Sequence, residues 1–289
     1  MLILSLILAH LIADFYMQTD KMVKDKRKNM IKHILHHLLM TFAVLTAFYV
    51  ADSFKDSIIE KLLKPLFFIV LTHYLIDLFK IMIVDSLKLK NEENLKRLFF
   101  FTIDQLLHLG MILLACQLFF EIDILRLGQQ ILSHHHGNIS SFNALLFIMI
   151  IFILATSVSG HIIRILVGSL PNQLLTFEGK YGFKNQRIIK NDTNNNVGEK
   201  GLTEEYNYTI FSKHDLSRGK LIGYIERLLV ILLTFNSAYP AIGFIVAAKS
   251  IARFKQMDDR DWAEYFLLGT LTSMFIGISL GILLKEVLT

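Results

Sequence analysis

The sequence predicts an all-α fold, a polytopic transmembrane helical bundle of about eight helices in two halves. Of the 289 residues, 53% are hydrophobic and only 19% are charged, and the mean hydropathy is +0.49. Soluble domains carry about 25% charged residues. Apolar stretches recur along the chain at lengths near the roughly 20 residues that a helix needs to cross a bilayer. Helices are expected because lipid offers no partner for unpaired backbone groups.

The predicted helices follow the apolar stretches. These stretches fall at about 1–17, 31–50, 63–84, 98–120, 141–167, 221–236, 239–254 and 262–284. The first lacks a basic leading segment and a small-residue cleavage site, and His10 and Asp14 interrupt it. We therefore interpret it as a short retained helix rather than a signal peptide. The segment 221–254 is broken by "NSAYPAIG" and forms either two spans or a re-entrant pair.

The predicted helices divide into two membrane halves. Residues 1–125 form a four-helix N-terminal half, and residues 141–289 form the C-terminal half. Within the latter, the segment at about 170–220 contains "KNDTNNNVGEKGLTEE", which is almost free of apolar residues. This composition predicts a flexible cytoplasmic loop.

Basic residues predict the orientation of the chain. Lys and Arg number about 21 in one set of alternate connections and about 5 in the other; the rich set is 18–32, 85–97, 168–220 and 255–261 with Arg253. Because cytoplasmic loops carry the basic excess, both termini are expected outside. The net charge of +5 is then a topology signal, and no nucleic-acid partner is expected. The single Cys116 excludes an internal disulfide.

Four apolar helices carry polar pairs at one spacing. "HLIAD", "HILHH", "HYLID" and "DQLLH" supply His10 and Asp14, His33 and His37, His73 and Asp77, and Asp104 and His108. Residues four apart lie on one face of a helix, one turn from each other. With the orientation above, all four pairs fall in the cytoplasmic half of the bilayer. Ionisable groups in spans are rare and usually face a bundle interior.

This constellation indicates a bound metal, although an unmetallated proton relay or polar network, or unrelated surface residues, are alternatives. Nitrogen and carboxylate donors without a thiolate suit Zn, Mn or Fe ions. Eight donors exceed the four of a structural zinc site, so there is room for two ions, or for one ion with supporting residues. The HExxH motif of zinc proteases does not occur in the chain.

Other polar residues near the pairs are weaker candidates. His36 lies about 100° from either neighbouring position in helical projection, so it is expected beside the site rather than in it. Gln18 and Gln105 could orient water or substrate, or could simply be interfacial. The "SHHHG" at 133–137 is interpreted as a solvated outside loop.

The C-terminal half carries a second polar set near the predicted cytoplasmic ends of its helices. Lys249, Arg253 and Arg227 are candidates for binding a substrate anion such as a lipid phosphate. The alternative is a belt of basic side chains that reach the interface. Glu226 and Glu264 are interpreted as supporting carboxylates that need Lys249 or Arg253 as partner.

Several of these motifs together resemble a known family. "LAHLIADFYMQTDKMVKDK", "HILHHLLM", "HYLIDLFK" and "DQLLHL" are similar to DUF3307, a family of uncharacterised bacterial integral membrane proteins, over roughly residues 1–120. The tail from "GKLIGYIERLLVILL" onward resembles the C-terminal part of longer members. The resemblance implies the bacterial inner membrane but no activity. The pairs are also similar in style to membrane proteins described as metal-dependent hydrolases.

The sequence favours a metal-dependent hydrolase whose site opens to the cytoplasm and acts on a lipid or membrane-associated substrate. Metal-activated water would be the nucleophile, and Asp77 or Asp104 would carry the proton. One alternative is a non-enzymatic ion or proton transporter or sensor. A second alternative is a structural or regulatory membrane partner that docks through 168–220. The sequence leaves the oligomeric state open.

Overall fold

The computed structural model describes most of the chain. The described residues are 1–19, 22, 25–51, 57–87, 93–132, 139–168, 179–182, 205–208, 213–254, 257 and 260–289. The "SHHHG" motif at 133–137 lies outside the described residues.

The described part of the N-terminal half is helical. Its elements are α1 (Leu2–Phe15), α3 (Lys26–Ala51), the π-helical turn η1 (Ile59–Leu63) that continues into α4 (Lys64–Leu87), α5 (Asn94–Phe120) and α6 (Ile124–Leu132). The apolar stretches predicted the first four helices. They missed α6, which lies in a segment expected to be a loop, because nine residues are too few to cross a bilayer.

The C-terminal half is also mainly helical. It contains α7 (Ser141–Ile153), the π-helical turn η2 (Leu154–Val158), α8 (Ser159–Val167), α10 (Lys213–Phe235), α11 (Tyr239–Ala252) and α12 (Arg260–Leu288). The expected flexible loop at 170–220 contains two short antiparallel strands, β1 (Gly179–Gly182) and β2 (Glu205–Tyr208), with Gly179 opposite Tyr208. The loop also contains the first turns of α10. The rest of it lies outside the described residues.

Five described helical segments are long and apolar enough to cross a membrane. They are Lys26–Ala51, Ile59–Leu87, Asn94–Phe120, Ser141–Val167 and Trp262–Leu288. Two shorter apolar helices, α1 and α11, complete the pattern. Bulky side chains such as Phe67, Phe244 and Phe275 are exposed on the bundle. Large exposed apolar surface of this kind is expected where lipid replaces water. The helical membrane bundle is therefore confirmed.

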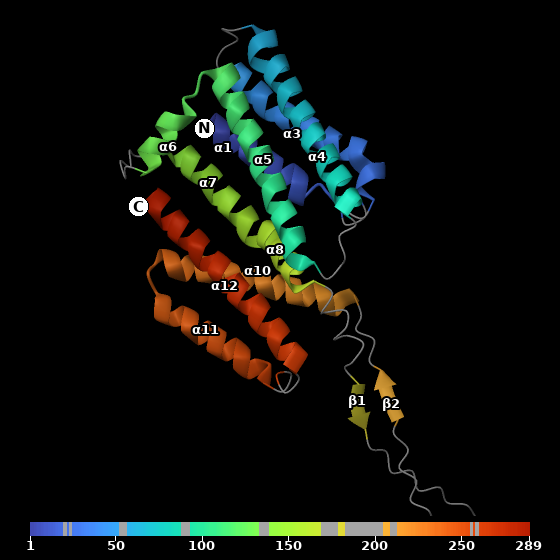
Figure 1. Ribbon diagram of the computed structural model, residues 1–289. Helices are drawn as coiled ribbons and strands as arrows, with labels where there is room; N and C mark the ends of the chain where they lie inside the picture. Colours follow the sequence, from blue (N-terminus) through green and yellow to red (C-terminus); the bar gives the residue numbers. More distant parts are fainter. Residues whose placement is uncertain are drawn as a thin grey trace, which may run out of the picture.

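The segment 221–254 forms two helices rather than one. α10 ends at Phe235, the backbone turns at Ser237 with a positive φ of 56°, and α11 runs back alongside (Figure 1). The chain termini lie at one end of the bundle, whereas β1 and β2 lie at the other (Figure 1). The orientation expected from the basic residues stays a prediction.

Helix α1 lies at the centre of the packing that positions the polar pairs. It contacts α3, α5 and α7. Next to the pairs, Leu6, Leu45 and Ile112 belong to one apolar core cluster, to which α1, α3, η1, α4 and α5 all contribute. On its other side, Leu8 and Leu11 pack with residues of α5, α7 and η2 in a second cluster. The polar face of α1 is therefore turned toward α3, α4 and α5.

Candidate metal centre

The four polar pairs meet in one place, between α1, α3, α4 and α5. We call these eight residues the His/Asp cluster: His10, Asp14, His33, His37, His73, Asp77, Asp104 and His108. Seven of them are buried and Asp14 is half-buried. Each helix contributes two residues four apart, so the cluster has two layers one helical turn from each other.

Asp14 is the centre of one group of donors. Its Oδ1 atom lies 2.9 Å from His37 Nε2, where it accepts a hydrogen bond, and 3.3 Å from His33 Nε2. His73 Nε2 lies 4.0 Å from the same oxygen and 3.2 Å from His33 Nε2. Donor atoms of these four residues all lie within 4.8 Å of one another.

Asp77 is the centre of a second group. Its Oδ2 atom lies 3.2 Å from His33 Nε2 and 3.7 Å from His73 Nε2. Its Oδ1 atom lies 3.9 Å from His108 Nε2. Donor atoms of His73, Asp77 and His108 also lie within 4.8 Å of one another. The two groups share His73, so they are parts of one cluster.

The remaining pair members lie at the edges of these groups. His10 Nε2 is 3.6 Å from Asp14 Oδ2, and His108 Nε2 is 3.5 Å from Asp104 Oδ1. The rings of His73 and His108 are stacked with centroids 4.0 Å apart, and those of His37 and His73 are stacked at 3.6 Å. His10 and Asp104 therefore lie beside the two groups of donors and belong to neither, and their predicted role as metal ligands stays a prediction.

The residues present suit a first-row divalent ion. Metal–ligand bonds of about 2.0–2.2 Å in a tetrahedral site place the ligand atoms roughly 3.3–3.6 Å apart. The separations between Asp14, His33, His73 and Asp77 are close to this range. No hydrogen bond within the described residues reaches His10 Nε2, His108 Nε2, Asp77 Oδ2 or Asp104 Oδ1. A buried polar atom without a partner is costly, and a cation would satisfy it.

Two lysines complete the cluster, and the sequence interpretation missed them. Lys26 Nζ donates to Asp77 Oδ1 at 2.5 Å, and Lys80 Nζ donates to Asp104 Oδ2 at 2.5 Å. Lys26 precedes His33 by seven residues, and Lys80 follows His73 by seven. Seven residues are close to two helical turns, so this spacing on the same face was the available signal.

Gln105 is the polar neighbour that the sequence placed near the pairs, and it contacts the cluster directly. Its amide Nε2 donates to Asp14 Oδ2 at 3.0 Å and lies 3.4 Å from Asp104 Oδ2. It therefore joins the carboxylates of α1 and α5. Gln18 is half-buried beyond the end of α1. His36 is half-buried and belongs to neither group of donors.

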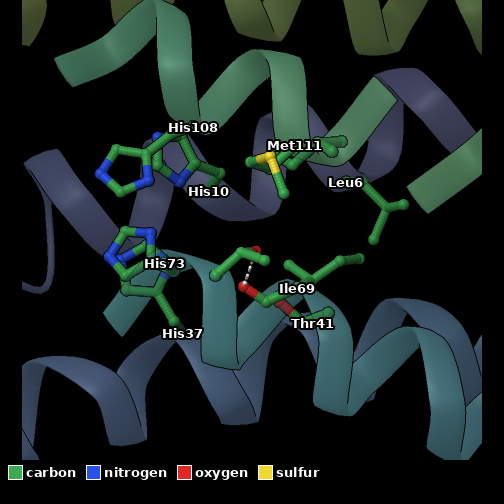
Figure 2. A pocket seen from close by; sticks show the side chains of 10 residues that line it. Leu6, His10, His37, Thr41, Ile69, His73, His108 and Met111 are labelled. Atoms are coloured by element: carbon green, nitrogen blue, oxygen red, sulfur yellow. Dashed lines mark hydrogen bonds between the residues drawn. The ribbon is translucent and has the colours of Figure 1, made fainter. Parts of the chain in front are cut away.

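A small cavity adjoins the imidazoles on the side away from the lysines. His10, His37, His73 and His108 line one end of it. The other end is lined by Leu6, Thr41, Ile69, Thr72, Met111 and Ile112. Figure 2 shows the four rings gathered on one side of the cavity and the aliphatic side chains with Met111 on the other. Water bound here would therefore lie between imidazole rings and a mainly apolar wall that also holds Thr41 and Thr72.

The second polar set occupies a separate place among α10, α11 and α12. Lys249 Nζ donates to Glu226 at 2.6 Å, which is the pairing expected for that carboxylate. Lys249 and Arg253 both lie over the ring of Phe266, at 5.5 and 6.0 Å from its centroid. Glu264 pairs instead with Arg260 of its own helix at 2.9 Å, on the exposed surface.

Arg227 is buried and is bonded to protein groups. Its Nε donates to the carbonyl oxygen of Ala155 at 2.5 Å, and its Nη1 donates to Ser273 Oγ at 3.3 Å. Ala155 lies in η2, and π-helical turns displace carbonyls from the regular helical pattern. In lipid such a group must be satisfied by a neighbouring helix. Arg227 thus joins α10, η2 and α12.

Comparison with known families agrees with the motifs. The model of the DUF3307 family, described as a protein of unknown function, matches residues 2–136. These residues hold the whole His/Asp cluster with both lysines, and over them the chain is similar to the DUF3307 family. Neither a curated protein nor a solved structure matches the chain. The likeness expected for the C-terminal tail lies outside the matched residues and stays a prediction.

Proposed function

We propose that the protein is a metal-dependent hydrolase embedded in the bacterial inner membrane, acting on a lipid or lipid-linked substrate. One observation carries the proposal. Four helices bring imidazole nitrogens and carboxylate oxygens to within 4.8 Å of one another, and several of these buried atoms have no hydrogen-bond partner among the described residues. Such a donor set in a water-poor interior fits a divalent Zn, Mn or Fe ion.

The residues take different parts in this proposal. Asp14, His33, His37 and His73 would hold an ion, and His73, Asp77 and His108 offer a second position. A divalent ion bound here supplies hydroxide from a bound water near neutral pH. Asp104 has one oxygen on Lys80 and a second, buried oxygen 3.5 Å from His108 Nε2. That second oxygen is placed to accept the proton that hydroxide formation releases, and Asp77 is the alternative acceptor.

The access route follows from the proposed orientation, with both termini outside. The lysine end of the cluster then faces the cytoplasm. On the other side, the cavity ends at Leu6, Ile69 and Ile112, which belong to the apolar core of this half. Thr41 and Thr72 also line this end, and the Thr72 hydroxyl donates to the Phe68 carbonyl of its own helix. A transporter would need polar groups that continue toward the outer end, so this mainly apolar wall supports a one-sided site over passage of ions or protons.

Metal analysis of the full-length protein in detergent tests the proposal. We expect the wild type to retain a first-row metal after dialysis and His73→Ala to lose it, because His73 belongs to both donor groups. His36→Ala is the matched control, since His36 lies on the same helix as His33 and His37 but in neither group. A metal-free wild type, or equal metal content in all three proteins, would contradict the proposal. Hydrolysis of a lipid ester panel by the loaded wild type then identifies the bond.

A further inference from the structure

We propose that Lys26 and Lys80 bind the phosphoryl group of the substrate, so that the hydrolase acts on a phosphate ester. This inference rests on the proposed function and adds a substrate class to it. The two lysines come from different helices, α3 and α4, and hydrogen bond to the carboxylates of Asp77 and Asp104. Among the residues that the structure describes, these two lysines place their ammonium groups in hydrogen bonds with the His/Asp cluster.

The order of the layers along the bundle supports this assignment. Asp14 and Asp77 follow the histidines of their helices by one turn, and Asp104 precedes His108 by one turn on a helix that runs the opposite way. The three carboxylates therefore lie at the same level, on the side of the histidines that faces the lysines. The cavity lined by the imidazoles and by Leu6, Ile69 and Met111 lies on the other side (Figure 2).

The exposed fraction of the side chains falls from the lysines to the carboxylates. The side chains of Lys26 and Lys80 are 22% and 25% exposed, whereas those of Asp77 and Asp104 are 1% and 4% exposed. A molecule that approaches from this end would meet the ammonium groups before the carboxylates. Aromatic rings lie beside Lys80. Phe101 of α5 contacts Phe15 of α1, both contact His161, and Lys80 Nζ lies over the ring of Phe101.

The charge of the cluster decides which substrates suit it. Asp14, Asp77 and Asp104 with the two lysines carry one net negative charge. One divalent ion reverses this to one positive charge, and two ions make it three. A positive charge attracts an anion more strongly in a buried, water-poor site than it does in water. Neutral esters and amides gain from this only as charge develops in their transition states, whereas a phosphate ester already carries charge at the reacting group when it binds.

Lysine is also the suitable residue for this role. An ammonium group donates three hydrogen bonds and binds phosphate as a point charge. In hydrolysis the water oxygen would bond to phosphorus while the bond from phosphorus to the alcohol oxygen breaks. The alcohol leaves with one proton of the water, and no electrons are exchanged. The lysines would hold the non-bridging oxygens on the side of the cluster where the substrate enters.

Binding of phosphate to the manganese-loaded, full-length protein in neutral detergent tests the proposal. Bound Mn²⁺ broadens the ³¹P resonance of any phosphate near it, so inorganic phosphate and phosphatidic acid in mixed micelles serve as separate probes. We expect Lys26→Met and Lys80→Met each to raise the phosphate dissociation constant about tenfold or more, the loss expected for one charged hydrogen bond. Lys64→Met is the matched control, because Lys64 makes a 2.5 Å pair with the exposed Glu60 of its own helix.

The outcomes separate this inference from the proposed function. A wild type without manganese contradicts both. Manganese-loaded protein that broadens neither probe, or lysine variants that bind as tightly as the wild type, contradict the phosphoryl assignment alone. Broadening of phosphatidic acid only identifies a lipid headgroup as the source, and broadening of both probes extends it to soluble phosphate esters.

A second variant protects the test against loss of folding. Lys26→Met leaves the Asp77 carboxylate without its ammonium partner, and its manganese content shows whether the cluster is intact. Lys26→Arg keeps the charge and is expected to bind phosphate more tightly than Lys26→Met. If Lys26→Met loses manganese, Lys80→Met carries the test, because its partner Asp104 belongs to neither group of candidate ligands. Wild-type phosphate affinity in Lys80→Met would then overturn the proposal.

Discussion

The two halves of this protein bury polar residues in opposite ways. In the C-terminal half, Arg227 and Glu226 each have hydrogen-bond partners on a neighbouring helix. In the N-terminal half, the His/Asp cluster leaves His10 Nε2, His108 Nε2 and two carboxylate oxygens without a hydrogen-bond partner among the described residues. A network in which each donor has an acceptor joins helices. A network of ring nitrogens and carboxylate oxygens that have few protons to share is suited to binding a cation.

This difference separates a structural role from a binding role. Burying polar groups in a membrane costs free energy, so we expect each network to offset this cost through stability or function. The contacts of Arg227 with η2 and α12 offset it by hydrogen bonds within the protein. In the proposed function, the His/Asp cluster does so by binding a metal ion. Substitutions in the two networks are therefore expected to change different quantities, and the following predictions use that contrast.

The largest effect on folding is expected from Arg227→Met. Methionine keeps most of the side-chain volume but removes the bonds to the Ala155 carbonyl and to Ser273. Two charge-assisted hydrogen bonds are lost, which we expect to lower the free energy of unfolding by about 3 kcal/mol. Thermal unfolding in detergent measures this loss. The metal content of the folded fraction should equal that of the wild type, and a metal-free folded variant would break the contrast.

A slightly smaller effect is expected from the metal itself. A ligand at a concentration 100 times its dissociation constant stabilises the folded state by about 2.7 kcal/mol. The wild type should show this gain in thermal unfolding on addition of metal, and Asp14→Asn should not, because Asp14 Oδ1 faces His33, His37 and His73. Glu226→Gln is the control from the other network. Loss of the metal-dependent gain in Glu226→Gln would show that the two networks act as one.

Packing in the C-terminal half is expected to be sensitive to one methyl group. A Cβ atom at Gly281 of α12 would lie 2.6 Å from Thr234 Cβ of α10, too close without movement of a helix. Overpacking of this kind costs about 2 kcal/mol, so Gly281→Ala should lower the unfolding temperature. Gly243→Ala is the control, because a Cβ there meets no atom within 4 Å. Equal stability of the two variants would contradict the close approach of α10 and α12.

The sequence predicted the His/Asp cluster because its spacing is periodic. Pairs four apart fix a helical face. The distribution of Lys and Arg predicts the direction of each helix, and the matched depth of the pairs was inferred from that direction. Lys26 and Lys80 obey the same periodicity at seven residues. Lys26 was counted as a topology signal, since a lysine near a helix end usually faces the interface. Lys80 lies inside the stretch predicted as a helix at 63–84 and was assigned no role.

The role of Arg227 had no comparable signal in the sequence. Its acceptor is a backbone carbonyl, and every residue has one. The turn that displaces that carbonyl, Leu154–Val158, reads in the sequence as a continuous apolar helix. The helix α6 escaped prediction for a related reason, since its length was judged against a membrane span. Contacts that depend on the backbone of a distant segment require the tertiary structure.

The smallest effect is expected where the two halves touch. Tyr16, which follows α1, shares a 3.3 Å hydrogen bond with the hydroxyl of Thr156 in η2. Tyr16→Phe should cost no more than about 1 kcal/mol in unfolding free energy, because one neutral hydrogen bond is lost at a half-exposed position. Tyr239→Phe is the control, since Tyr239 and Tyr16 are both 51% exposed. Thermal unfolding and metal content are measured on the same samples.

The metal content of Tyr16→Phe is the sharper of its two measurements. If the His/Asp cluster is held by α1, α3, α4 and α5 alone, this variant keeps its metal, because Asp14 retains His37 and Gln105 as partners. Loss of metal would mean that the position of Asp14 depends on η2, and through Ala155 on Arg227. The C-terminal network would then be a positioning element for the metal centre, and the separation of binding from structure between the two halves would fail at this contact.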